Sequence, residues 1–180
     1  MTLTRYPWYE TVTQGEPIMQ GDLLRSCPIF VPITGVTPEK ADEAVSFDIM
    51  EYDVIVMTQS CDLVQGKVAL VLVCPVWSLS EFEKKTEFIR SATGKETLRQ
   101  GNLPGYHLLN KCELKGFERE HAVVDFRTTY SIPFALITNI ATKQRRLRLL
   151  PPYREHLSQA YARFFMRVGL PVDIPSFKKS

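Results

Sequence analysis

The sequence predicts a mainly-β α+β domain, most simply a small curled barrel closed by a helix. Three observations lead to this fold class. Short runs of β-branched and aromatic residues alternate with turn residues, which is typical of strands. One stretch between these runs changes to helical spacing, and a longer helical stretch follows the last strand. The length of 180 residues fits one domain over residues 1–180, because two domains of this total size would each have a thin core.

The first expected strands lie in the N-terminal half. The turn signal at residues 15–17 (GEP) leads into a strand entered at residues 21–24 (GDLL). Residues 31–48 contain proline, glycine and mixed polar residues, so we expect a long loop there. Residues 53–58 (DVIVMT) are short and rich in β-branched residues, so we expect a strand buried on both faces. A turn at Gln65-Gly66 joins it to the next strand, 67–76 (KVALVLVCPV), and the two are expected to form a β-hairpin.

The period of the pattern changes after this hairpin. Residues 80–83 (SEFE) match the S-x-x-E capping box that starts helices, and Phe82, Phe88 and Ile89 give an amphipathic face. The sequence therefore predicts a helical insertion over 79–102. We expect its helix to run from about Glu81 to Ala92, to break near Gly94 and to make a second turn towards Gln100.

Three strands and a helix are expected to complete the domain. The strands are residues 106–114, 121–127 and 132–140, with Pro133 at a bulge, an edge or the strand start. The helix covers 153–168, opens at Pro151-Pro152 and closes at Gly169. Its apolar residues recur at helical spacing and are Leu157, Ala160, Tyr161, Phe164, Phe165 and Val168.

Composition and motifs exclude several classes of protein. Hydrophobic residues make up 44% and charged residues 23%, which excludes disorder and coiled coil. The longest apolar runs are far shorter than the ~20 residues that span a bilayer, and the N-terminus has no secretory signal pattern. We therefore expect a cytoplasmic protein. P-loop, dinucleotide-binding, zinc-protease and α/β-hydrolase motifs are missing from the sequence.

The four cysteines form no C-x-x-C pair, so we expect neither structural zinc nor disulfides, and no cofactor. The string TQSCDL at 58–63 follows a buried strand. Cys61 would be a nucleophile, or the centre of a metal-dependent enzyme, if His107 or His121 came close. Asp62 argues against an activated thiolate, because a neighbouring carboxylate raises the thiol pKa. The alternative is that Ser60 and Asp62 satisfy turn backbone groups while Cys61 packs inward.

Charge is unevenly distributed along the chain. Residues 1–110 carry 9 basic and 14 acidic side chains, whereas residues 111–180 carry 13 basic and 6 acidic ones. The densest basic cluster is residues 143–148 (KQRRLR). Its arginines either contact a phosphate backbone or an acidic partner, or form a solvated basic edge; they are Arg145, Arg146 and Arg148.

The order of motifs resembles the MazF/PemK-type toxin superfamily of SH3-like barrels. The resemblance covers about half the chain in five segments. These are the GDL at 21–23, DVIVMT, VALVLVCPV, the PGYHL at 104–108 and HAVVDFRTTYSIPFAL at 121–136. It rests on hydrophobic pattern together with Gly21, Asp22, Pro75, Tyr106 and Asp125.

The resemblance implies a homodimeric, metal-independent endoribonuclease that cuts single-stranded RNA. The family's catalytic hydroxyl falls on Ser78. Its catalytic arginine falls on Tyr52, which carries no positive charge to stabilise the transferring phosphoryl group. For cutting to occur, another cation such as Arg25 or Arg127 would have to take over that role. The insertion falls where family members carry a loop beside the RNA groove, and it offers Lys84 and Lys85 as RNA-binding residues. The alternative is an ordinary amphipathic lid, because four glutamates of the insertion almost cancel its positive charge.

A second hypothesis follows from the missing arginine. The chain would then be a catalytically inactive SH3-like barrel that binds a protein or nucleic-acid partner. Its setting would be a bacterial stress, toxin–antitoxin or phage-defence system, with an antitoxin-like or defence protein as the partner. In that case the C-terminal helix would offer its apolar stripe to the partner.

Overall fold

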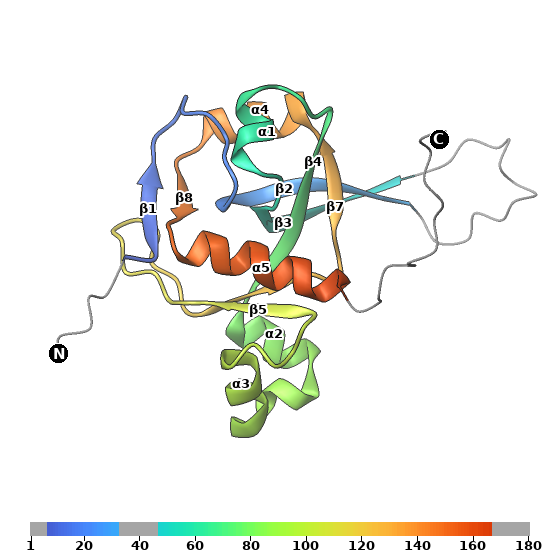
Figure 1. Cartoon of the computed structure of the whole chain (residues 1–180), viewed down its shortest axis with the longest axis vertical. Helices are drawn as coiled ribbons and strands as arrows, with labels where there is room; N and C mark the ends of the chain where they lie inside the picture. The colour runs from blue at the N-terminus through green and yellow to red at the C-terminus, as the bar shows by residue number, and fades with distance from the viewer. Residues whose placement is uncertain (1–6, 33–46, 167–180) are drawn as a thin grey trace, which may run out of the picture.

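The computed structural model describes residues 7–32 and 47–166 (Figure 1). Its strands are β1 (Tyr9–Val12), β2 (Asp22–Pro32), β3 (Phe47–Val56), β4 (Leu70–Ser78), β5 (Tyr106–Leu109), β6 (Ala122–Asp125), β7 (Tyr130–Pro133) and β8 (Arg146–Leu149). Its helices are α1 (Ser60–Val64), α2 (Leu79–Lys85), the 3-10 helix η2 (Glu87–Arg90), α3 (Ala92–Arg99), α4 (Phe134–Lys143) and α5 (Tyr153–Phe165).

The strands form one antiparallel sheet in the order β1-β8-β2-β3-β4-β6-β5, and β7 pairs with the first half of β4. The mainly-β α+β class is thereby confirmed. The sheet is open, with β1 and β5 as its edges in the described part of the chain. Of the predicted loop over 31–48, residues 31–32 and 47–48 belong to β2 and β3, and residues 33–46 lie outside the described residues.

The predicted hairpin is present. Val54 of β3 lies opposite Pro75 of β4, and Ile55 lies opposite Cys74. The link between the strands contains α1 as well as the turn at Gly66, which has a φ of 61°. Burial on both faces explains the continuous apolar run at 54–56, whereas the start of β4 alternates, with Leu70 and Leu72 exposed.

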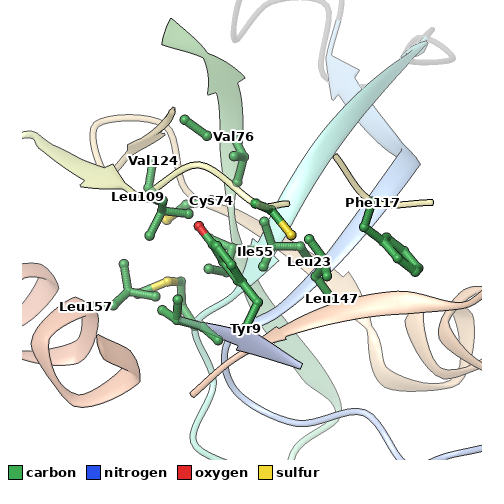
Figure 2. Packing of buried hydrophobic residues seen from close by; sticks show 14 of the residues in the cluster. Tyr9, Leu23, Ile55, Cys74, Val76, Leu109, Phe117, Val124, Leu147 and Leu157 are labelled. Atoms are coloured by element: carbon green, nitrogen blue, oxygen red, sulfur yellow. The ribbon is translucent and has the colours of Figure 1, made fainter. Parts of the chain in front are cut away.

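Side chains alternate between two layers. Val54 and Val56 pack on one side with Ile137 of α4, and all three are fully buried. Ile55 points to the other side, where Leu157 of α5 closes the core. Figure 2 shows this second layer, and Figure 1 shows α5 lying across the sheet. The predicted C-terminal helix is confirmed over 153–165; its expected end at 168–169 lies outside the described residues.

The helical insertion is present, but it consists of three short helices. Phe82, Ile89 and Leu98 are buried together against Val123 of β6, so this lobe shares its core with the sheet. Gly94 lies inside α3 rather than at a break. A Cβ at this position would come 1.9 Å from the carbonyl oxygen of Phe88, so only glycine allows α3 to pack this closely on η2.

The predicted capping box is displaced by two residues. Both 78–81 and 80–83 match S-x-x-E, and the structure uses the first: the Ser78 side chain accepts a hydrogen bond from the Glu81 backbone. Ser80 instead donates to the Glu120 carboxylate over 2.5 Å.

The predicted strand over 132–140 is wrong beyond Pro133, because residues 134–143 form α4. Ile137 and Ala141 are buried four residues apart, which is helical spacing, and Pro133 has no N–H to continue a ladder. The expected strands at 106–114 and 121–127 are shorter, ending at Leu109 and Asp125.

The basic cluster at 143–148 is largely internal. Residues 146–149 form β8, whose four residues are all buried between β1 and β2. Arg146 and Arg148 both donate to the carboxylate of Asp22, which is fully buried. Arg146 also donates to the carbonyl oxygens of Ala141, Glu16 and Pro17. The expected solvated edge is therefore wrong for these two arginines.

Candidate functional site

Two adjoining hollows contain five of the predicted site residues, including all four considered for RNA cleavage. The first, here named the serine cavity, has a volume of about 630 Å³ and is lined by Arg25, Tyr52 and Ser78. The second, here named the aromatic cleft, has a volume of about 440 Å³ and is lined by Tyr130, Tyr106 and Arg127 among others. Tyr52 and Trp77 line both hollows, so the two adjoin, and together they are named the groove below.

A bulge in β2 places Arg25 at the serine cavity. The register between β2 and β3 shifts between Leu24 and Cys27, and Ser26 has a φ of 46°, in the left-handed region that few non-glycine residues adopt. The Ser26 backbone N–H donates to the Asp53 carboxylate over 3.2 Å and holds the bulge in place. A bulge changes the direction of a side chain, and here it leaves Arg25 exposed.

Ser78 combines two roles at the end of β4. Its hydroxyl caps α2 by accepting from the Glu81 N–H over 3.2 Å, and it donates to Glu81 Oε2 over 2.8 Å. Hydrogen bonds from the Ser78 side chain and backbone lower the pKa of Glu81. A carboxylate with a lowered pKa is a weak general base. The geometry therefore explains Ser78 as a helix cap and offers it little activation as a nucleophile.

The charges around the serine cavity are mixed. Arg25 and Arg119 contribute positive charge, and five carboxylate side chains also line the cavity: Glu51, Asp53, Glu81, Glu118 and Glu120. Since like charges repel, the middle of this cavity disfavours a phosphate group. It favours neutral groups that donate hydrogen bonds.

Aromatic rings form the walls of the aromatic cleft. Tyr52 and Tyr130 stack with 5.9 Å between ring centroids, and Trp77 meets Tyr52 edge-on at 5.6 Å. Lys85 Nζ lies 3.1 Å from the centroid of the Trp77 ring, and the Arg127 guanidinium carbon lies 5.6 Å from that of Tyr106. The cleft thus combines aromatic rings with two cations, which lie over the faces of Trp77 and Tyr106.

The predicted thiol site is not assembled. Cys61 is exposed on α1, so the expectation that it packs inward is wrong; its Sγ lies 3.7 Å from Gln59 Oε1. His107 lies on β5, and Figure 1 shows α1 and β5 on opposite sides of α5. Burial, with the charge of His156, lowers the pKa of His107 to about 4.

The other groups of this thiol hypothesis do not complete a site either. The Ser60 hydroxyl accepts a hydrogen bond from the Gln20 N–H over 3.1 Å, so this side chain does satisfy a backbone group. Asp62 forms hydrogen bonds in the turn through its backbone N–H and carbonyl oxygen. His121 accepts from the Leu79 N–H through its carbonyl oxygen. Residues 7–32 and 47–166 contain no group of three or more His, Cys, Asp or Glu side chains arranged to hold a metal ion.

The predicted RNA-binding residues separate into three groups. Lys85 belongs to the aromatic cleft, and Lys84 is exposed on α2 and lines neither hollow. Arg146 and Arg148 are held by Asp22 in the interior, and a guanidinium group in that position does not reach a phosphate. Arg145 is exposed and lies against Phe117.

Sequence reasoning missed the aromatic members of the site. Trp77, Tyr130 and Phe117 come from β4, β7 and the segment before β6, so no local pattern links them. The sequence offers one indication of the aromatic site. Trp77 and Tyr52 lie next to predicted strands, where an aromatic side chain packs beside a neighbouring strand.

No protein-family model and no curated protein matches this chain. The helices of the described residues are all too short or too polar to cross a membrane.

Proposed function

We propose that this protein binds single-stranded RNA, with unpaired bases in the aromatic cleft, and that its curved sheet is an SH3-like barrel of the kind found in MazF-like proteins. The stacked and edge-on rings of Tyr52, Trp77 and Tyr130 carry this proposal. An unpaired base exposes a flat π face, and stacking on an aromatic side chain contributes about 1–3 kcal/mol per base. A duplex keeps these faces covered, so the cleft selects single strands.

The cations beside the rings fit the same ligand. Lys85 and Arg127 lie against Trp77 and Tyr106, and each combines a ring contact with a charge that a phosphate would attract. The carboxylates next door suit the exocyclic amino groups of bases, which donate hydrogen bonds. The groove therefore holds aromatic surface, cations and acceptors in the proportions that a single strand needs.

Truncation of Trp77 tests this proposal. The affinity for a labelled unstructured RNA is measured by fluorescence anisotropy in the wild type, in Trp77→Leu and in Trp8→Leu. Trp8 is a matched control because it stacks on Tyr153 at 3.7 Å and lines neither hollow. We expect Trp77→Leu to weaken binding about 5- to 150-fold, the effect of losing one stacked base. Equal affinity of the wild type and Trp77→Leu contradicts the proposal.

A second candidate function is metal-independent RNA cleavage in the serine cavity. The observation that favours it is the convergence of Ser78, Tyr52 and Arg25 from three different strands on one cavity. Arg127, the other cation considered for this role, lines the aromatic cleft instead. The resemblance also implies that a homodimer would be the active form.

Cleavage is tested with long single-stranded RNA in the presence of a chelator. Ser78→Asn removes the hydroxyl but keeps a residue that caps helices well, so loss of cutting would not be due to loss of the cap. If the protein cuts RNA, we expect Ser78→Asn and Arg25→Gln to abolish cutting while RNA binding persists. RNA binding without cutting by the wild type supports a binding protein and contradicts the cleavage hypothesis.

A further inference from the structure

Two arginines share one phenyl ring beside the serine cavity. The guanidinium carbon of Arg25 lies 5.0 Å from the centroid of Phe117, and that of Arg145 lies 5.4 Å from the same point. The two carbons are therefore no more than 10.4 Å apart. Phe117 is only 5% exposed and belongs to the core cluster, where Figure 2 shows it near Leu147 and Leu23.

Neither arginine is neutralised within the described ranges. No carboxylate there lies within 4.0 Å of either guanidinium group. Arg25 donates to the Gly116 carbonyl oxygen over 3.3 Å, and the Glu118 carboxylate accepts from the Gly116 N–H over 2.9 Å. Arg146, the residue after Arg145, differs because its guanidinium group donates hydrogen bonds to the Asp22 carboxylate and to three carbonyl oxygens.

The structure brings these like charges together at a cost. They come from the β2 bulge and from the residue before β8, 120 positions apart in the sequence, and Phe117 comes from a third segment. At a separation of up to 10.4 Å these two exposed guanidinium groups repel each other weakly, because salt screens charges over about 8–10 Å, and the contacts with Phe117 offset part of that repulsion. A bound anion would remove it, and guanidinium groups are well suited to phosphate.

We propose that Arg25, Arg145 and Phe117 form a phosphate-binding site for the RNA strand whose bases occupy the aromatic cleft. This inference rests on the proposed function. Arg25 lines the serine cavity, which continues into the cleft through Tyr52 and Trp77. Phosphates of the strand would then bind at the two arginines and at the cations of the cleft, while bases and sugars face the carboxylates that line the serine cavity.

The salt dependence of RNA binding tests this site. The double variant Arg25→Gln/Arg145→Gln is compared with the wild type and with Arg163→Gln, which removes an exposed arginine of α5 outside the groove. Affinity for a single-stranded RNA is measured between about 50 and 200 mM salt. Each lost phosphate contact lowers the slope of log affinity against log salt by about 0.7, so we expect the double variant to lose about 1.4.

The controls separate this site from the cleft. Arg163→Gln is expected to keep the wild-type slope. Trp77→Leu is expected to weaken binding without changing the slope, because stacking releases no counterions. A double variant that binds RNA with the wild-type slope overturns the phosphate site and leaves the proposed function intact.

A second measurement uses no RNA. Binding of inorganic pyrophosphate is followed by calorimetry in the same proteins, and we expect it in the wild type and Arg163→Gln and its loss in the double variant. If RNA does not bind but pyrophosphate does so through these arginines, the proposed function fails and the anion site stands. If pyrophosphate does not bind, or binds the double variant equally, the site is refuted. If an acidic polypeptide binds through these arginines and pyrophosphate does not, the ligand is a protein partner and the phosphate site is refuted.

Discussion

Asp22 provides the sharpest test of how this fold is held together. Its carboxylate is fully buried and accepts hydrogen bonds from the Met19 N–H at 3.0 Å, from Arg146 Nε at 2.7 Å and from two nitrogens of Arg148 at 2.6 and 3.0 Å. Asp22→Asn keeps the shape but removes the negative charge that contacts both guanidinium groups. The amide nitrogen would also face a guanidinium donor.

The expected cost follows from these contacts. Hydrogen bonds to charged groups contribute about 1.5–3 kcal/mol each, and breaking one partner of a buried ion pair costs about 3–5 kcal/mol. We expect Asp22→Asn to lower the free energy of unfolding by about 3–5 kcal/mol, a large part of the 5–15 kcal/mol typical of a domain. Urea denaturation followed by circular dichroism measures this difference.

Asp53→Asn is the matched control. Asp53 is only half-buried, and its carboxylate accepts one hydrogen bond, from the Ser26 N–H over 3.2 Å. We expect this variant to lose no more than about 1 kcal/mol. The double variant Asp22→Asn/Arg148→Met removes one buried charge of each sign, so its loss should be smaller than the sum of the two single losses. A loss below about 1 kcal/mol in Asp22→Asn would refute the buried ion-pair argument.

Three further predictions concern pH, the thiol and the insertion. Burial lowers the pKa of His107 to about 4, so the unfolded chain binds a proton there that the folded protein does not. The contribution of neutral His107 to the free energy of unfolding is therefore fully present above about pH 6.5, and it falls by up to about 3 kcal/mol towards pH 4. Denaturant titrations should show a smaller fall in His107→Gln, and the same pH profile in the variant and the wild type contradicts this prediction. Because Cys61 is exposed, Cys61→Ser should change the unfolding free energy by less than about 0.5 kcal/mol, and a larger loss in a urea titration would show that the thiol is packed. Replacing 79–102 by a short Gly/Ser linker removes Phe82 and Ile89 from the core they share with β6, so we expect a molten or insoluble product by near-ultraviolet circular dichroism; a cooperatively folded product would show that the insertion is a separable lid.

Several features of the fold follow from local pattern alone. The run of β-branched residues at 54–56 forms part of a strand buried on both faces, because alternate side chains enter different layers and all three are apolar. The spacing of Leu157, Tyr161 and Phe164 defines α5 for the same reason, since residues three and four apart share one face of a helix. The change from strand-like to helical spacing of apolar residues likewise predicts a helical insertion after β4. The position of its N-cap does not follow from the sequence, because both 78–81 and 80–83 match the capping-box motif.

Local pattern fails where two periodicities overlap. Residues 132–140 are apolar and β-branched enough for a strand, but burial of Ile137 and Ala141 against the β2–β3–β4 layer requires a helix. The choice was made by the space between the layers, and the pairing with β4 ends where that strand begins, at Leu70 opposite Pro133. At such positions the packing of side chains, rather than the intrinsic β-propensity of the residues, decides the secondary structure.

The candidate site was decided by tertiary structure. The sequence by itself determined that Arg145, Arg146 and Arg148 form a dense basic cluster, and it supplied Tyr52 and Ser78 at the ends of predicted strands. The pairing of β2 with β8 then decided that Arg146 meets Asp22, 124 positions earlier, and becomes internal. Arg145, one residue before that strand, stays at the surface and joins Arg25 on Phe117. The physical reason is that periodicity reports only which face of its own element a side chain occupies, whereas the partner of a charge depends on long-range register, which no local window contains.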